Sequence, residues 1–408
     1  MSNSSDRVRS LDALRGALAF YVALHHVGFL YSDWWRAAGS VPWLITKLTA
    51  FGHSAVIGFF LLSGFAIMRA HGGDSLDRAA RNRYALRRVR RLYGVYLGAL
   101  CVTALLYLGH GRLARIALEL PANLLMLQAG GDPWWRKPYL GNTPLWSLSF
   151  EAAYYLLFPA LLLLGRNFGI RILAAAIAAC GLLGIAGVNL GGWRDASILA
   201  LLPIWWLGAW LATPSCSMRR WRAPSWLAGY GLGLIPLLFR SIPDLTVRDL
   251  TTAFAFLPLF VRLTRKENAA SRSAPSLPLF LGLLLLHGIG AQGLLGGTHP
   301  STRGAFELAY LAAPGIFAGA APLIENLARR PPLRPLLLGL CGISYGLYAV
   351  HFPVLAFGRD LAAAQGLSPA AALGLAGGGL VVALILAKIL EGPWHRTWVA
   401  WLERRWPR

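Results

Sequence analysis

The chain has 408 residues, of which 56% are hydrophobic and only 14% are charged, and its mean hydropathy is +0.53. Soluble domains carry about 25% charged residues, so this composition excludes an ordinary soluble protein. The net charge of +22 would suit a nucleic-acid-binding protein, but basic residues also hold the cytoplasmic loops of membrane proteins inside and contact anionic lipid. We therefore expect an all-α, polytopic transmembrane helical bundle that contacts lipid and binds no nucleic acid.

Leucine-rich runs of about 20 residues, the length that crosses ~30 Å of hydrocarbon, recur along the whole chain. We expect the first run to be an uncleaved transmembrane helix, because it is long, carries polar residues and precedes no small-residue cleavage site. The pattern predicts about ten to twelve spans, since the seventh and eighth candidates are short. The candidates are residues 11–31, 50–69, 91–109, 145–164, 170–188, 196–212, 225–239, 250–263, 277–295, 306–323, 336–357 and 369–390.

Lysine and arginine gather in the connecting segments that would be cytoplasmic if the N-terminus were inside. The positive-inside rule therefore predicts a cytoplasmic N-terminus. Residues 1–390 are expected to form one transmembrane domain. Residues 391–408 mix tryptophans with Arg and His, which predicts an amphipathic cytoplasmic tail at the membrane interface. The four cysteines are scattered without CxxC spacing, so no metal site or disulfide framework is indicated.

The first predicted helix, "RSLDALRGALAFYVALHHV", carries three polar residues on one stripe. Arg15 and His26 are separated by eleven positions, which at about 100° per residue puts them on one face, roughly 16 Å apart. Asp12 lies one turn before Arg15, close enough to pair with it. The alternative is that Arg15 snorkels to the inner headgroups and His26 makes a helix contact. An aligned polar stripe inside a membrane helix favours a functional role.

Two further titratable residues, Glu151 and His351, are predicted at the depth of His26, in the outer third of their spans. A carboxylate buried in a membrane helix without a role is rare. A histidine beside a carboxylate is a suitable general base near neutral pH. The alternative is a polar cluster that joins helices. We favour an active site or a proton path.

Arginines crowd the start of the third span in "RNRYALRRVRRLYGVYL". The positive-inside rule accounts for most of them. Arg88 and Arg91, one turn apart and with Arg87 beside them, also fit a clamp for phosphate groups, because a planar guanidinium binds two oxygens at once. This pattern predicts a cytosolic ligand that bears phosphate.

Five phrases follow one another along the chain and together resemble the membrane-bound acyltransferase-3 family, the O-acyltransferases of bacterial cell-envelope glycans. The resemblance covers most of the chain, although Gly94 stands where the family usually has Pro after Leu-Tyr. The phrases are an Arg and a His separated by ten residues (Arg15, His26), FFLLSGF at 59–65, Arg-x-x-Arg before Leu-Tyr (Arg88, Arg91), Trp-Ser-Leu-x-x-Glu at 146–151, and Ser-Tyr-x-x-Tyr-x-x-His at 344–351.

The resemblance implies a multi-pass enzyme of the bacterial inner membrane. It would move an acyl group, commonly acetyl, from cytosolic acyl-CoA to a glycan hydroxyl on the outer side, without a permanently bound cofactor. The residues implied at the donor are Ser63, Arg87, Arg88 and Arg91. The residues implied in the chemistry are His26 as the base, Glu151 orienting or assisting it, Arg15 on the acyl-CoA or the thioester oxygen, and Asp12 beside Arg15. The residues implied as support for the substrates are Trp146, Ser344, Tyr345, Tyr348 and His351.

Direct transfer and an acyl-histidine intermediate both stay open. Three other functions are compatible with parts of the sequence. The same chemistry would serve an acceptor that is a small metabolite, such as a macrolide sugar. A polytopic transporter would also carry intramembrane charges, but the chain shows no internal repeat. A scaffold that only binds lipid or glycan would not need the polar stripe.

Overall fold

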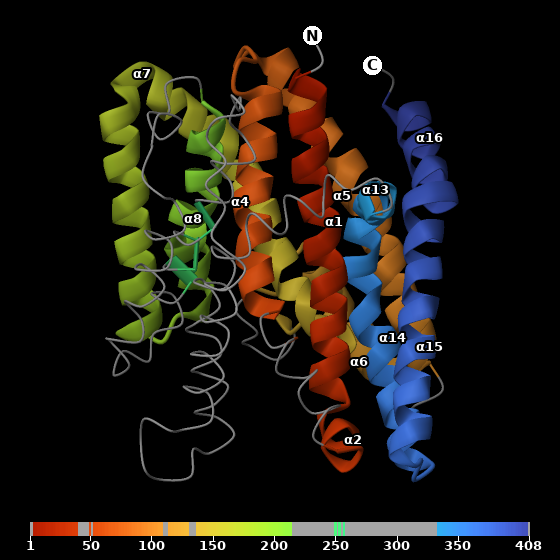
Figure 1. Cartoon of the computed structure of the whole chain (residues 1–408). Coiled ribbons are helices and arrows are strands. Elements are labelled where there is room, and N and C mark those ends of the chain that lie inside the picture. Colours follow the sequence, from red (N-terminus) through yellow and green to blue (C-terminus); the bar gives the residue numbers. More distant parts are fainter. Residues whose placement is uncertain are drawn as a thin grey trace, which may run out of the picture.

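In the structure, a computed structural model, all regular secondary structure of the described residues is helical (Figure 1). These are residues 3–39, 49, 52–108, 113–129, 136–213, 249–250, 252–253, 256–257 and 333–406, of which 3–10, 113 and 333–334 are described by their backbone alone. The α-helices are α1 (Asn3–Leu30), α2 (Ser32–Ala37), α4 (Gly52–His71), α5 (Arg78–Tyr107), α6 (Leu113–Leu124), α7 (Trp146–Asn189), α8 (Ser197–Ala212), α13 (Leu333–Gly342), α14 (Ser344–Ala364), α15 (Pro369–Ile389) and α16 (His395–Arg405). The short segments are the 3₁₀ turns η2 (Tyr139–Gly141), η3 (Thr143–Leu145) and η4 (Arg194–Ala196), and the π-helical η7 (Leu390–Trp394).

Six helical stretches among the described residues are long and apolar enough to cross a membrane. A seventh is present if α13 and α14, which meet at a bend of 73°, form one broken span. This confirms the predicted class, an all-α transmembrane bundle. Four predicted spans lie outside the described residues, apart from a few positions in the second of them, so the total of ten to twelve stays a prediction. They are residues 225–239, 250–263, 277–295 and 306–323.

The predicted spans 145–164 and 170–188 are joined in one helical stretch, α7. The stretch breaks at Gly169, which has φ +84° and ψ 166°, a conformation that glycine adopts without steric cost. The two limbs of α7, before and after Gly169, therefore run in opposite directions and meet at the end of the bundle that carries both chain termini (Figure 1). The second limb packs closely on α8, because Gly184 faces the backbone of Ala200.

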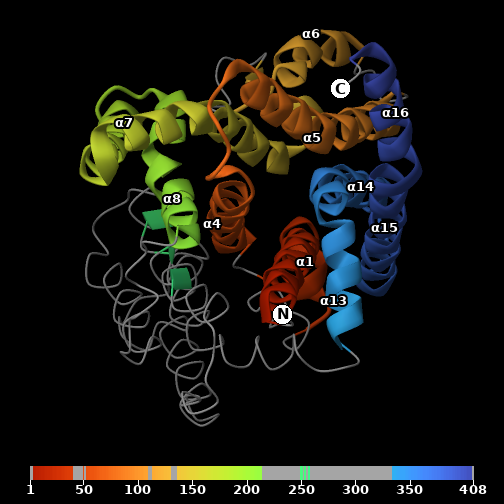
Figure 2. The same cartoon turned by 90° about the horizontal axis from the view of Figure 1, so that it is seen from above.

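Small residues bring α4 and α8 into direct backbone contact. A Cβ added at Gly64 would overlap the carbonyl oxygen of Trp205, and one at Gly208 would overlap that of Leu61. Close approach at small residues is the usual way in which membrane helices associate. On the other side, α1 lies between α4 and the pair α13 and α14 (Figure 2). The helix with the polar stripe, α1, thus packs against α4, α13 and α14.

The stretch from α6 to η3 holds a buried group of polar side chains, which we call the polar clasp. Glu119 accepts a hydrogen bond from the backbone N–H of Leu140 at 2.7 Å. Asn142 donates to the carbonyl of Ala349 on α14 at 2.9 Å. The clasp therefore ties this stretch to α14. Its members are Glu119, Asn123, Gln128 and Asn142, each at most 2% exposed.

The predicted amphipathic tail is a helix that continues α15 through η7 into α16 and lies along α5. The indole N–H of Trp394 donates to the carbonyl of Gly94 at 2.6 Å, and a Cβ at Gly94 would meet the ring of Trp398. The glycine at the family's usual proline position therefore makes room for a tail tryptophan. Arg90 on α5 and Glu403 on α16 add an ion pair at 3.4 Å. The cytoplasmic placement of the tail stays a prediction.

Candidate active site

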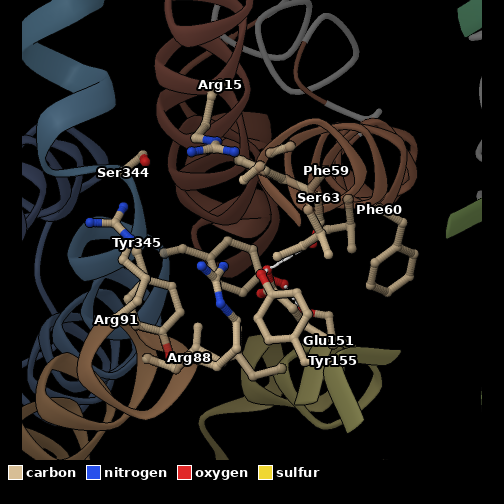
Figure 3. Close-up of a pocket in the computed structure, with 18 of the residues that line it drawn as sticks. Arg15, Phe59, Phe60, Ser63, Arg88, Arg91, Glu151, Tyr155, Ser344 and Tyr345 are labelled. Atoms are coloured by element: carbon tan, nitrogen blue, oxygen red, sulfur yellow. Dashed lines mark hydrogen bonds between the residues drawn. The ribbon is translucent and has the colours of Figure 1, made fainter. Parts of the chain in front are cut away.

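A cavity of about 500 Å³ opens between α1, α4, α5, α7 and α14 (Figure 3). Four arginines and a single carboxylate line it, so its wall is strongly positive. Residues close to the end of α4 and the start of α5 contribute to it, so it lies in the half of the bundle that carries both termini (Figure 1). The sequence-predicted site residues that line it are Arg15, Ser63, Arg87, Arg88, Arg91, Glu151, Ser344, Tyr345 and Tyr348.

Three guanidinium groups point into this cavity from two helices, those of Arg15, Arg88 and Arg91 (Figure 3). Arg88 lies over the rings of Tyr84 and Tyr155, with its central carbon 5.6 and 5.5 Å from the ring centres. Its buried Nε has no hydrogen-bond partner among the described residues. The aromatic rings therefore fix the direction of this guanidinium, while a donor atom stays available to a ligand.

His71, at the end of α4, is not part of the cavity lining but contacts two arginines that are, Arg87 and Arg88. Its Nδ1 lies 2.8 Å from a carboxylate oxygen of Asp74, and its Nε2 accepts a hydrogen bond from Arg88 at 3.2 Å. Arg87 pairs with the same Asp74 oxygen at 3.3 Å. Arg87 thus already has a carboxylate partner, which distinguishes it from Arg15, for which the described part of the chain shows no ion pair.

Glu151 is held by the hydroxyl groups of two neighbours. Ser63 donates to its Oε1 at 3.0 Å, and Tyr155 donates a short hydrogen bond to the same oxygen. The indole N–H of Trp205 donates in turn to the Ser63 hydroxyl at 3.2 Å. Both donors meet the same oxygen, and they leave the other oxygen of Glu151 without a partner in the described structure.

The start of α14 supplies two tyrosines to the cavity. Tyr348 donates to the carbonyl of Pro144 at 3.0 Å, and its hydroxyl lies 2.7 Å from that of Ser147. The hydroxyl of Tyr345 is buried and has no partner among the described residues. Ser344 bonds back to the carbonyl of Cys341. A buried hydroxyl without a partner is costly, so Tyr345 is a candidate donor to a ligand in the cavity.

His26 and His351 form a second polar centre outside the cavity lining. Nε2 of His351 lies 2.9 Å from Nδ1 of His26. Each Nδ1 also meets a carbonyl one turn back on its own helix, that of Val22 at 3.0 Å and that of Leu347 at 2.8 Å. His351 is fully buried and His26 is partly exposed. Tyr348 connects the two centres, because it lines the cavity and its ring lies 6.0 Å from that of His351.

The expected contact between Glu151 and His26 is not formed. No hydrogen bond joins them within the described structure, because the face of α7 that carries Glu151 turns toward Ser63 on α4. The partner of His26 is His351 instead. The expected pairing of Asp12 with Arg15 is also wrong for the described residues, since Arg15 extends into the cavity and Asp12 is not part of its lining.

Trp146 is not part of the cavity lining; its ring stacks on that of His53 at 5.7 Å. Some residues of the site were not expected from the sequence. Tyr155 follows Glu151 by four positions, a helical spacing that could have indicated the contact. Glu391, only 5% exposed, accepts from the N–H of Gly346 and lies 3.6 Å from Arg91. A carboxylate at the end of the last apolar run was the available signal.

A family model described as an acyltransferase domain (Acyl_transf_3) matches residues 8–388. The chain belongs to the acyltransferase-3 family. Within this family it is similar to Acyltransferase MdmB of Streptomyces mycarofaciens, with 32% identity over 187 residues. The match covers 42% of this chain and 44% of the relative, so the chain spans less than half the length of that curated protein. No solved structure shows significant similarity to the chain.

As a multi-pass membrane protein of the acyltransferase-3 family, the chain is expected to meet both an acyl donor and an acceptor. Family membership confirms the resemblance inferred from the five phrases and argues against a transporter. The geometry separates two kinds of chemistry. The cavity offers positive charge and hydrogen-bond donors, which suit an anionic ligand. The histidine pair offers two imidazoles in contact, which suit proton transfer.

Proposed function

We propose that the protein is an O-acyltransferase that moves an acyl group from cytosolic acyl-CoA to a hydroxyl of a cell-envelope or exported glycan. Acetyl is the expected acyl group. The proposal places the chain in the bacterial inner membrane with both termini in the cytoplasm. The observation that carries it is the convergence of Arg15, Arg88 and Arg91 on one cavity of about 500 Å³.

The cavity suits a CoA thioester in both charge and shape. CoA carries a pyrophosphate and a further phosphate, and arginine forks bind phosphate oxygens in pairs. Arg88 and Arg91 would meet these groups, since they lie in the half of the bundle whose end is proposed to be cytoplasmic. Apolar side chains such as Val56, Phe59 and Ile67 line the rest, where they would cover the pantetheine chain.

The proposed reaction uses the histidine pair at the far side of Tyr348. His26 takes the proton of the acceptor hydroxyl, and the hydroxyl oxygen attacks the thioester carbonyl carbon. The new C–O bond forms, the C–S bond breaks, and CoA leaves as a thiol with the proton that His26 returns. Arg15 in the cavity wall would stabilise the negative charge that develops on the thioester oxygen. Glu151, bonded to Ser63 and Tyr155, belongs to the donor side.

The test is transfer from radiolabelled acetyl-CoA to the host's envelope glycan by purified, reconstituted protein. We compare wild type with Arg88→Gln and with Arg83→Gln, an exposed arginine of the same helix that does not line the cavity. Arg88→Gln should raise the KM for acetyl-CoA by about tenfold or more, since a charge-assisted hydrogen bond contributes roughly 1.5–3 kcal/mol. Arg83→Gln should leave KM unchanged.

The outcomes separate the two halves of the proposal. Equal KM values for the two arginine variants would remove the cavity as the donor site. Label on a small hydroxylated metabolite, such as a macrolide sugar, and none on the glycan would keep the donor and replace the acceptor. No label on any acceptor with acetyl-CoA, but transfer from a longer acyl-CoA, would change the acyl group alone.

A further inference from the structure

The proposed reaction leaves open which nitrogen of His26 takes the proton and what holds the ring in place. Three contacts bear on this. Nδ1 of His26 lies 3.0 Å from the Val22 carbonyl and 2.9 Å from Nε2 of His351. Nδ1 of His351 lies 2.8 Å from the Leu347 carbonyl. Both carbonyls precede their histidine by one helical turn, so the helices themselves supply the acceptors.

Only one arrangement of protons satisfies all three contacts when both rings are neutral. A carbonyl oxygen can only accept, so Nδ1 of His351 must donate to Leu347. A neutral imidazole has a single N–H, so Nε2 of His351 must accept. Its partner, Nδ1 of His26, must therefore donate, and its single N–H is shared between Nε2 of His351 and the Val22 carbonyl, which also can only accept. Any other neutral assignment sets a bare nitrogen against a carbonyl oxygen, or two like groups against each other.

We propose that His351 is a positioning residue that fixes His26 as its Nδ1–H tautomer, so that Nε2 of His26 takes the acceptor proton. The inference rests on the proposed acyl transfer and deepens it. It gives His351 the role that the sequence suggested for Glu151, and it names the reacting atom of His26.

The surroundings of His351 suit such a role. Its ring is fully buried on α14, with the ring of Tyr348 at 6.0 Å. The ring of Phe352 stands edge-on to that of His26 at 5.0 Å. Apolar neighbours strengthen a hydrogen bond and make its loss costly. When Nε2 of His26 gains the proton, its Nδ1–H still donates to His351, so the imidazolium is stabilised while the proton stays on His26 until the thiolate takes it.

The kinetic test replaces His351 in two ways. His351→Leu removes the acceptor and should lower kcat about 10²-fold or more, since the wrong tautomer of a catalytic histidine has a large effect, with the KM for acetyl-CoA unchanged. His351→Gln places an amide oxygen near the lost Nε2 and should recover at least a tenth of the wild-type kcat. The matched control is Tyr31→Phe, which removes a different buried hydrogen bond to α14, that to the Leu355 carbonyl. It should keep kcat within twofold.

A double variant separates positioning from folding. If His351 acts only through His26, then His351→Leu should cause no further loss in a His26→Ala background. A full additional loss there would overturn the proposal, because it would show that His351 acts independently of His26. Equal kcat for His351→Leu and wild type would overturn it as well.

The tautomer can be read without activity. ¹⁵N-histidine NMR of the wild-type protein should show a protonated Nδ1 and a bare Nε2 for the signal that disappears in His26→Ala. A protonated Nε2 at neutral pH would overturn the inference even if acyl transfer occurs. A wild type that shows the expected tautomer and transfers no acyl group would instead overturn the proposed function and leave the assignment of protons intact.

Discussion

The arginine cavity and the histidine pair are two polar centres of one bundle, and they are built in opposite ways. In the described structure the cavity has buried donors without partners, the Nε of Arg88 and the hydroxyl of Tyr345. The pair of His26 and His351 has partners for three of its four ring nitrogens and no carboxylate among them. Under the proposed function a charged ligand would complete the cavity, while the fold holds the histidine pair and leaves Nε2 of His26 for the acceptor. Changes in the cavity should therefore appear in KM, and changes in the pair should appear in kcat.

The largest effect is expected at His26. His26→Ala removes the proposed base and should lower kcat by about 10³-fold, within the range of general base catalysis. The KM for acetyl-CoA should stay within twofold, because His26 does not line the cavity. Steady-state transfer by reconstituted protein measures both constants. A tenfold rise in KM with unchanged kcat would reverse the comparison.

Arg15 lies in the cavity wall but is proposed to act on the thioester oxygen. A substitution of Arg15 therefore tests how the cavity and the histidine pair work together. Arg15→Gln should lower kcat about 10²-fold, as loss of one donor to a developing oxyanion does. Arg15→Lys keeps the charge and should recover part of this loss. If Arg15→Gln changes only KM, then Arg15 binds phosphate like Arg88 and the thioester oxygen has another partner.

A substitution of Glu151 distinguishes two arrangements. The sequence suggested that Glu151 contacts His26, whereas in the structure it contacts Ser63 and Tyr155. Glu151→Gln keeps an oxygen that accepts from Ser63 and Tyr155 but removes the charge. We expect the KM for acetyl-CoA to change by about tenfold, the scale of one charge-assisted bond, with kcat within threefold. A loss of kcat as large as that of His26→Ala would restore Glu151 as a partner of His26.

A substitution in the helix contact that supports both polar centres should have a weaker effect and should affect the two centres alike. Gly64→Ala would force α4 away from the carbonyl of Trp205 and should destabilise the protein by about 1–3 kcal/mol, as overpacking does. The thermal midpoint in detergent should fall. Every preparation that still binds the acyl donor should lose kcat to a similar extent. The control is Gly378→Ala on α15, where an added Cβ meets nothing within 4 Å. Equal midpoints for the two variants would contradict the close contact of α4 with α8.

The smallest effect is expected at Asp77, which caps the start of α5. Hydrogen bonds from the Ser75 hydroxyl and the Ala80 N–H lower the pKa of Asp77 below its usual 3.8. A lowered native pKa stabilises the fold above the usual value, and this contribution disappears as the pH falls through the native value. Asp77→Ala should therefore lower the thermal midpoint slightly at pH 7, and the difference from wild type should vanish in strong acid. A difference that does not depend on pH would show that the cap acts without its charge.

The sequence predicts the fold class and the members of the site better than their contacts. Apolar run lengths identify the spans, and one stripe of α1 does carry both Arg15 and His26. The depth of a residue along its helix, however, does not tell how that helix is rotated relative to its neighbours. Glu151 and His351 were both expected at the level of His26, and only the turn of α7 toward Ser63 decides that His351 is the partner. Asp12 and Arg15 show the same limit, because a long side chain reaches its cavity rather than its nearest neighbour in sequence.

The polar clasp has a consequence for the order of assembly. Asn142 bonds to the carbonyl of Ala349, which is 207 residues further along the chain. This bond can form only after α14 has been made, whereas Glu119, Asn123 and Gln128 have their partners earlier in the chain. The same α14 carries His351 and the cavity tyrosines. Attachment of the clasp to α14 and completion of both polar centres thus depend on the same late helix, so a chain released before α14 would lack His351 and both cavity tyrosines.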